Sequence, residues 1–180
     1  MPTWLAFQRA VNVGARKYPM AELRAVLEKA GYDDVATHIQ TGNIRLGSPV
    51  RSQAKLEAAL EELFLADRGF DVPTVAMRPE ELAAIAADAD EVLAEGAPEF
   101  GHYVELLRGE PSASDRAVIA SLGGIDLPGQ RAVVRGRAVH LLYDIPFHEA
   151  RPPNAALKRA LGVSTNRNVK VVRALAAKWC

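Results

Sequence analysis

Cysteine, long apolar runs and signal segments are scarce or absent in this sequence of 180 residues. The single cysteine is Cys180, so the chain can form neither an internal disulfide nor a cluster of cysteine metal ligands. Charged residues interrupt every apolar stretch well before the roughly 18 residues of a membrane-spanning helix. The first residues also lack the basic, apolar and small-residue order of a secretion signal. We therefore expect a cytoplasmic protein that does not contact a membrane.

Motifs that identify a reaction are also missing. Gly14 stands alone, without the spacing of either common phosphate-binding glycine loop. The four histidines, His38, His102, His140 and His148, show no metal-ligand spacing, and no G-x-S-x-G nucleophile turn occurs. We expect no metal and no cofactor, and the sequence leaves open whether the protein is an enzyme.

The composition indicates a folded core with an uneven distribution of charge. Hydrophobic residues make up 49% of the chain, which is enough to bury a core in one large domain or two small ones. Residues 48–130 hold sixteen acidic and six basic residues, a net charge of −10, whereas residues 131–180 hold two and ten, a net charge of +8. This asymmetry indicates either a basic surface that faces a polyanion or an acidic middle segment that folds against the basic end.

The hydrophobic period of residues 1–78 predicts a βαββαβ domain, the order of the ferredoxin-like fold. Residues 3–11 alternate as a strand does, and Met20, Leu23 and Leu27 recur with the period of a helix that stops at Gly31. The remaining predicted elements are strands at 35–39 and 43–46, a helix at 52–69 and a strand at 71–77.

A second unit of helices and strands is predicted from residue 79 onward. Its predicted elements are helices at 78–90, 112–124, 154–162 and 166–179, a strand at 102–107, and a hairpin at 131–143 that turns at Gly136. No closing strand is evident. We therefore predict an α+β protein of two ferredoxin-like domains, residues 1–78 and 79–180, each with an antiparallel sheet and its helices on one face.

The predicted topology brings two polar loops of the first domain together. In a βαββαβ unit the end of the first strand and the hairpin between the second and third strands lie at the same end of the sheet. We therefore expect Arg9, Asn12, Gly14, Arg16 and Lys17 to face Gln40, Thr41, Gly42 and Asn43 across a polar cleft. Turn chemistry alone also explains the residues of either loop, because asparagine and glycine favour tight turns.

Three segments resemble the bacterial Domain of Unknown Function 1697 family: RAVNVG at 9–14, PMAELRAVLEKAGYDDVATHIQTGNI at 19–44 and RPPNAALKRALGVSTNRN at 151–168. Family members show R-G/A-I/V-N-V-G, a Q-S-G-N-V-like hairpin and a late R-L-T-N, L-G-V and T-T-R-N series. This chain departs from the pattern at Pro152-Pro153, where Leu-Thr is usual, and at Val169-Lys170, where Trp-Asn is common. The resemblance implies two ferredoxin-like plaits, and it implies no activity because none is established for the family.

The late arginine and asparagine residues suggest a second site. A helix that starts near residue 166 presents N–H groups at the positive end of its dipole, and Arg167 adds a planar donor there. Arg151 and Asn154 begin the preceding helix. The segment predicts either an anion site or plain helix capping. The full set of candidate ligand-binding residues is Arg9, Asn12, Gly14, Arg16, Thr41, Gly42, Asn43, Arg151, Asn154, Arg167 and Asn168.

Three classes of function fit these residues. The first is a binding module for a phosphate-bearing small ligand or a nucleic acid, which the basic loops favour. The second is an enzyme that acts on a small phosphorylated substrate, although the sequence displays no general base for it. The third is an oligomerisation protein without a ligand. RNA recognition of the RRM kind is disfavoured, because Asn43 and Arg45 stand where stacking aromatic residues belong.

Overall fold

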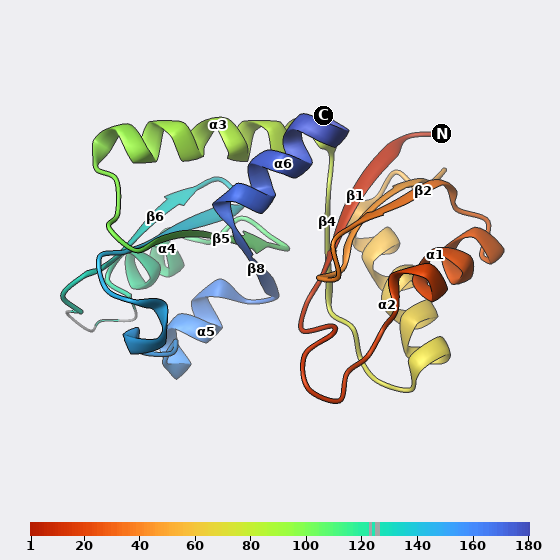
Figure 1. Cartoon of the computed structure of the whole chain (residues 1–180), viewed down its shortest axis with the longest axis horizontal. Coiled ribbons are helices and arrows are strands. Elements are labelled where there is room, and N and C mark those ends of the chain that lie inside the picture. Colours follow the sequence, from red (N-terminus) through yellow and green to blue (C-terminus); the bar gives the residue numbers. More distant parts are fainter. Residues whose placement is uncertain (123, 125–126) are drawn as a thin grey trace. The chain divides into compact units, whose positions relative to one another are not determined.

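The computed structural model describes residues 1–122, 124 and 127–180. It has an α+β fold, and the described residues form two four-stranded antiparallel sheets and six α-helices (Figure 1). Contacts divide the chain into a first unit, Met1–Glu81 with Trp179–Cys180, and a second unit, Leu82–Lys178. Within the described residues, no helix is both long enough and apolar enough to cross a membrane.

The first unit has the βαββαβ order that its hydrophobic pattern predicts. Its elements are β1 (Thr3–Gln8), α1 (Met20–Lys29), β2 (Asp33–His38), β3 (Asn43–Gly47), α2 (Gln53–Arg68) and β4 (Thr74–Met77). The strands lie in the order β2-β3-β1-β4, and every neighbouring pair is antiparallel. The central strand β1 therefore ends beside the β2–β3 hairpin, as the predicted topology requires.

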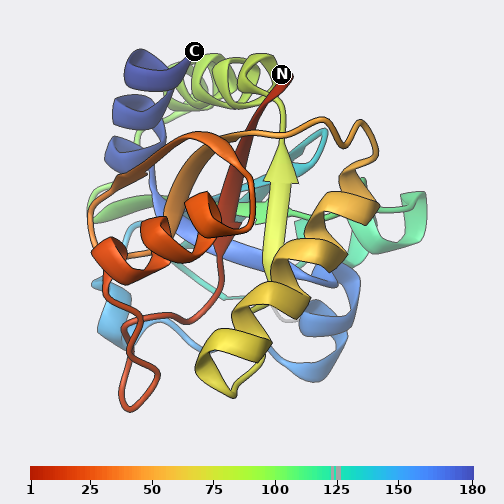
Figure 2. The same cartoon turned by 90° about the vertical axis from the view of Figure 1, so that its right-hand side faces the viewer.

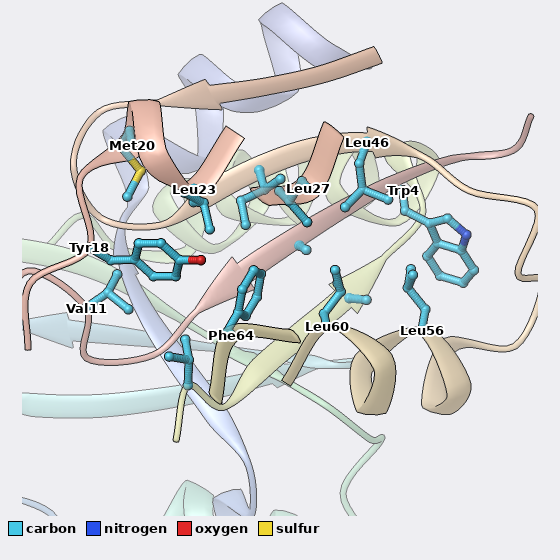
Figure 3. Packing of buried hydrophobic residues seen from close by; sticks show 14 residues of the cluster. Trp4, Val11, Tyr18, Met20, Leu23, Leu27, Leu46, Leu56, Leu60 and Phe64 are labelled. Carbon is cyan, nitrogen blue, oxygen red and sulfur yellow. The ribbon is translucent and has the colours of Figure 1, made fainter. Parts of the chain in front are cut away.

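Both helices of the first unit pack on one face of its sheet (Figure 2). Leu56, Leu60 and Phe64 recur every four residues along α2, so they share one side of that helix. They meet Trp4 and Ala6, alternate residues of β1, in a common buried cluster (Figure 3). Each fully buried large apolar side chain stabilises the fold by about 1.5–3 kcal/mol relative to an exposed one.

The second unit repeats this strand order with additional helices. Its elements are α3 (Pro79–Glu95, which starts in the first unit), β5 (Gly101–Leu107), α4 (Ala113–Ala120), β6 (Gln130–Arg135), β7 (Ala138–Tyr143), the 3-10 turn η1 (Phe147–Glu149), α5 (Ala155–Leu161), β8 (Ser164–Asn168) and α6 (Val169–Trp179). The sheet order is β6-β7-β5-β8. The helix expected at 112–124 ends at Ala120, and position 123 of that prediction lies outside the described residues.

Helices cover both faces of the second sheet, whereas the sequence predicted helices on one face only. Leu107 and Val139 pack with Ile119 of α4 and Leu157 of α5. Figure 1 shows α3 and α6 on the opposite side of the sheet. The reason is visible in β5, where Leu106 is buried as well as Leu107. A strand that is buried on both faces needs a layer of helices on each.

The closing strand β8 was missed by the sequence pattern. Residues 166–168 were expected in the last helix, but Ser164–Asn168 forms a strand that pairs with β5, and α6 begins at Val169. Serine and asparagine are uncommon in strands, so local propensity gives no signal for this element. Pairing with β5 supplies the backbone hydrogen bonds that decide its conformation.

Candidate functional site

The loop that follows β1 is held in a strained backbone conformation. Ala10, Asn12 and Gly14 all have positive φ angles, of 54°, 57° and 57°. Glycine accepts this region freely and asparagine tolerates it, whereas alanine does so at a cost of roughly 1–2 kcal/mol. Such strain persists only where the surrounding contacts over-determine the conformation, and it often marks a functional loop.

The side chain of Asn12 supplies three of those contacts. Its Nδ2 donates to the carbonyl oxygens of Gln40, at 2.7 Å, and Tyr18, at 3.0 Å. Its Oδ1 accepts a hydrogen bond of 2.9 Å from the backbone N–H of Tyr18. Since Gln40 belongs to the β2–β3 hairpin, Asn12 joins the two loops that the topology places side by side.

The glycine of the hairpin completes this junction. The backbone N–H of Gln8 donates to the carbonyl oxygen of Gly42 at 2.8 Å. A Cβ at Gly42 would stand 2.6 Å from the Cβ of Gln8, so the close approach of the two loops requires glycine. Asn43 is buried, and its Nδ2 donates to Thr41 Oγ1 at 2.9 Å and to the carbonyl oxygen of His38 at 3.1 Å.

Two cationic side chains of the loop are exposed, and a third, that of Arg16, forms contacts within the protein. Arg9 and Lys17 are exposed, and Thr41 is exposed on the hairpin. Arg16 donates through Nε to the carbonyl oxygen of Ala10 at 3.0 Å, and its guanidinium carbon lies 4.8 Å from the centroid of the Phe70 ring. Arg16 also donates to the backbone carbonyl of Asp71. Arg16 thus braces the loop, whereas Arg9 and Lys17 are presented to solvent.

The candidate residues of the second unit divide between different surroundings. Arg151 is exposed in the segment before α5, and Asn154 caps α5 by accepting a 2.8 Å hydrogen bond from the backbone N–H of Leu157. Asn168 similarly accepts from the backbone N–H of Lys170 at 2.9 Å, at the start of α6. Capping therefore occupies the side-chain oxygens of both asparagines.

Arg167 lies on the other face of β8 from Asn168. Successive strand residues point to opposite faces, and these two pair with consecutive residues of β5. The Arg167 side chain is buried, and it donates to Thr165 Oγ1 at 2.8 Å and to the carbonyl oxygen of Asn166 at 2.7 Å. Burial lowers the pKa of Arg167 to about 10, so its guanidinium stays charged at neutral pH. The structure does not bring Arg167 and Asn168 to one surface.

Two histidines that the sequence treated as unrelated form a buried pair. His102 Nε2 lies 2.9 Å from His140 Nδ1, and the rings lie on adjacent strands β5 and β7. Burial lowers the pKa of both histidines to about 4, and the charges of Arg135 and Arg173 add to the effect on His140 and His102 respectively. The described residues contain no group of three or more metal-ligating side chains that could hold a metal ion.

The opposite face of the same strands carries a carboxylate and aromatic rings. Glu105 of β5 accepts hydrogen bonds from Ser164 Oγ at 2.7 Å and from Asn166 Nδ2 at 2.9 Å. Tyr103, two residues earlier on β5, stacks at 4.8 Å between centroids with Phe147. The only sequence signal for this cluster is the alternation within the strand predicted at 102–107, and β8 has to be known before its partners can be named.

A surface hollow of ≈ 400 Å³ lies elsewhere on the first unit, and its lining residues are Val26, Lys29, Ala30, Leu63, Ala66 and Asp67. These residues belong to α1, to its C-cap Ala30 and to α2. None of the residues predicted for the ligand site lines it. The hollow is therefore separate from the loops that Asn12 joins.

Comparison with known proteins places the chain among uncharacterised relatives. A family model described as a protein of unknown function, DUF1697, matches residues 1–140. The solved structure of a conserved bacterial protein, SP0830 from Streptococcus pneumoniae, is similar with a TM-score of 0.73 and 21% identity, and covers 99% of this chain and 98% of that one. At this identity the likeness concerns the fold alone. A search of curated proteins matches none.

Proposed function

Since the chain belongs to the DUF1697 family of proteins of unknown function, we propose from its own residues that it is a binding module for a phosphate-bearing small ligand. The ligand lies on the loop of residues 9–17 in the first unit, with Thr41 of the hairpin beside it. The observation that carries the proposal is the left-handed backbone at Ala10, Asn12 and Gly14, which presents Arg9 and Lys17 to solvent.

Charge and space support a phosphate at this loop. Arg9 and Lys17 supply two cations, and arginine matches phosphate oxygens with two parallel N–H groups. A Cβ at Gly14 would meet no atom within 4 Å, so the loop tip is open to a ligand. The bracing by Asn12 and Arg16 fixes the loop before binding, which lowers the entropy cost of association.

The candidate residues between positions 151 and 168 do not carry this proposal. Arg167 is buried and serves the packing of β8, so the phosphate proposal rests on Arg9, Asn12, Gly14, Arg16 and the hairpin. Arg151 is exposed in the second unit and remains a candidate for an anion of its own.

A thermal-shift panel of inorganic phosphate, nucleotides, sugar phosphates and short nucleic acids tests the proposal. A ligand at a hundred times its Kd stabilises the folded state by about 2.7 kcal/mol. Arg9→Gln and Lys17→Gln should each reduce the shift. Lys29→Gln is the matched control, because Lys29 is an exposed lysine at the end of α1, and it should leave the shift unchanged. A flat panel, or equal shifts in all three variants, would contradict the proposal.

We also propose that each unit is a ferredoxin-like plait, with a domain boundary near residue 78, and that the protein is cytoplasmic. The orders β2-β3-β1-β4 and β6-β7-β5-β8 support the fold class, because both correspond to a βαββαβ chain path with the first strand in the interior of the sheet. Expression of residues 1–78 alone, followed by a heat-unfolding measurement, tests the boundary. A cooperative transition is expected.

A further inference from the structure

Three aromatic rings and one carboxylate gather on one face of the second unit's sheet. Tyr103 and Glu105 are alternate residues of β5, so they point to the same face about 7 Å apart. The Tyr143 ring of β7 lies 5.9 Å from that of Tyr103 in an edge-to-face arrangement. Phe147 of η1 contacts both rings, at centroid distances of 4.8 and 5.4 Å.

Two neutral donors fix the Glu105 carboxylate in place. One oxygen accepts from Ser164 Oγ at 2.7 Å and the other from Asn166 Nδ2 at 2.9 Å, and both donors are neutral. The charge of Glu105 acts on the buried guanidinium of Arg167, whose pKa burial lowers and that charge raises. A carboxylate accepts about four hydrogen bonds, so these two leave capacity on each oxygen.

The charge of Glu105 reaches the aromatic rings. Burial, followed by the charge of Glu105 and the proximity of Tyr103, raises the pKa of Tyr143 to about 12. Tyr143 therefore stays protonated at neutral pH, and its ring keeps the electron-rich face of a neutral phenol. The outermost ring, Phe147, is 55% exposed, which makes the cluster accessible from solvent.

Fastening the edge strand β8 explains only part of this arrangement. The hydrogen bonds from Ser164 and Asn166 hold β8 to β5, and glutamine at position 105 would accept them as well. The charge of Glu105 also raises the pKa of the buried Arg167 guanidinium, whereas the three rings do not require that charge. A half-exposed carboxylate beside three aromatic rings does match the chemistry that recognises organic cations, which aromatic faces and carboxylates both attract.

We propose that Tyr103, Glu105, Tyr143 and Phe147 form a binding site for a small organic cation, of the alkylated ammonium class. The cation lies against the exposed face of Phe147 and the Tyr103 ring, with Glu105 as its counter-ion. A phosphate would be repelled by Glu105, so this site and the loop of the first unit take ligands of opposite charge. The two proposals stand on different units and fail independently.

Titration of the full chain with tetramethylammonium and with choline tests the proposal, with binding followed by NMR shifts of the tyrosine and phenylalanine ring protons. The neutral isostere of choline, 3,3-dimethylbutan-1-ol, is titrated in parallel. Both cations should shift the ring signals of Tyr103, Tyr143 and Phe147, and the alcohol should bind at least tenfold more weakly. Equal binding of the alcohol and choline, or preference for a neutral nucleoside such as adenosine, would overturn the proposal.

Two variants and one control identify the groups responsible. Glu105→Gln should weaken choline binding about tenfold, which corresponds to about 1.4 kcal/mol. Phe147→Leu should weaken it about threefold while leaving the fold intact, because Phe147 is 55% exposed. Glu91→Gln removes an exposed carboxylate of α3 and should change nothing. If Glu105→Gln loses its folded NMR spectrum, the choline affinity of Phe147→Leu tests the site instead. Unchanged choline affinity in Phe147→Leu would contradict the site.

Discussion

Nε2 of His102 and Nδ1 of His140 lie 2.9 Å apart, with His102 5% exposed and His140 fully buried. At this distance the two nitrogens share one proton in a hydrogen bond, so at least one of the two must lack a proton of its own. The outer nitrogens, His102 Nδ1 and His140 Nε2, have no hydrogen-bond partner among the described residues. At least one imidazole of the pair is therefore neutral in the folded protein.

This pair predicts a loss of stability in mild acid. Both folded-state pKa values are about 4, below the ordinary histidine value of 6.5, so the unfolded chain binds more protons between these limits. The stabilisation is complete above pH 6.5 and is lost as the pH falls toward 4, by a few kcal/mol in total. Urea unfolding measured from pH 4.5 to 7.5 checks this expectation.

Two sets of variants test whether the buried histidines cause the loss of stability in acid: one replaces both buried histidines, and the other replaces an exposed histidine. His102→Phe combined with His140→Leu should flatten the pH dependence between 4.5 and 6.5, because no buried imidazole then has to charge. His148→Gln should leave the slope as it is, since the His148 side chain is 82% exposed. A slope that persists in the double variant would assign the acid sensitivity to carboxylates instead.

Arg167→Lys should destabilise the protein by about 1–3 kcal/mol. From the sequence, position 167 was expected on the surface, where this change would cost less than about 0.5 kcal/mol. The guanidinium is buried, however, and its Nη1 donates to both Thr165 Oγ1 and the Asn166 carbonyl. An ammonium is more strongly hydrated than a guanidinium and sits on a flexible stem, so it is costlier to bury and to hold in this position. Urea midpoints give the measurement, and Arg151→Lys, at an exposed position, should be neutral. Equal midpoints for the two variants would show that the guanidinium contacts contribute little.

Gly42→Ala should be far more damaging than Gly14→Ala, although both glycines have left-handed backbones, with φ of +70° and +57°. At Gly14 an added methyl group meets nothing within 4 Å, so only the conformational cost of roughly 1–2 kcal/mol applies. At Gly42 the methyl group would stand 2.6 Å from the Gln8 Cβ, and the β1–β3 pairing would have to open. Melting temperatures of the two variants, compared with that of the parent, distinguish the effect of the steric clash from that of backbone strain. Similar values would mean that the hairpin moves freely.

Asn12→Asp is expected to lower the free energy of unfolding by about 1–3 kcal/mol. The shape is kept, but a carboxylate cannot donate to the carbonyl oxygens of Gln40 and Tyr18, and places negative charge beside them. Asn12→Gly removes the same contacts without adding charge, and it suits the φ of 57°. The aspartate variant should therefore be the less stable of the two in urea unfolding. The reverse order would mean that the Oδ1 acceptor, which aspartate keeps, contributes more than the repulsion between the carboxylate and the two carbonyl oxygens costs.

The basic segment 131–180 should bind heparin or duplex DNA only weakly. Arg135 forms a 3.1 Å ion pair with Glu95, and Arg173 pairs with Asp90, so part of the basic charge meets the acidic helix α3. Binding to DNA through neutralised phosphates would give a log–log salt slope of about −0.9 per phosphate. Elution from a heparin column at low salt is the expected result. Retention with a steep salt dependence would instead indicate a polyanion as partner.

Most elements of this fold were accessible to sequence pattern because each is defined by its own hydrophobic period. The buried leucines of α2 recur at helical spacing, and β6 and β7 flank a turn at Gly136. Even the meeting of Asn12 with Gln40 followed from topology, because chain direction alone places the two loops at one end of the sheet. The hydrogen bonds of Asn12 could not be predicted, since they depend on where its side chain points.

The sequence by itself determined the α+β class, the positions of seven of the eight strands along the chain and the polar character of the loop after β1. These features depend on local hydrophobic period and turn chemistry. Only the tertiary structure decided the conformation of Ser164–Asn168, whose polar residues form a strand once β5 offers its backbone groups. That pairing buries Arg167 on one face and brings Asn166 to Glu105 on the other. Side chains from distant segments meet only after strands pair, and pairing is a property of the whole sheet.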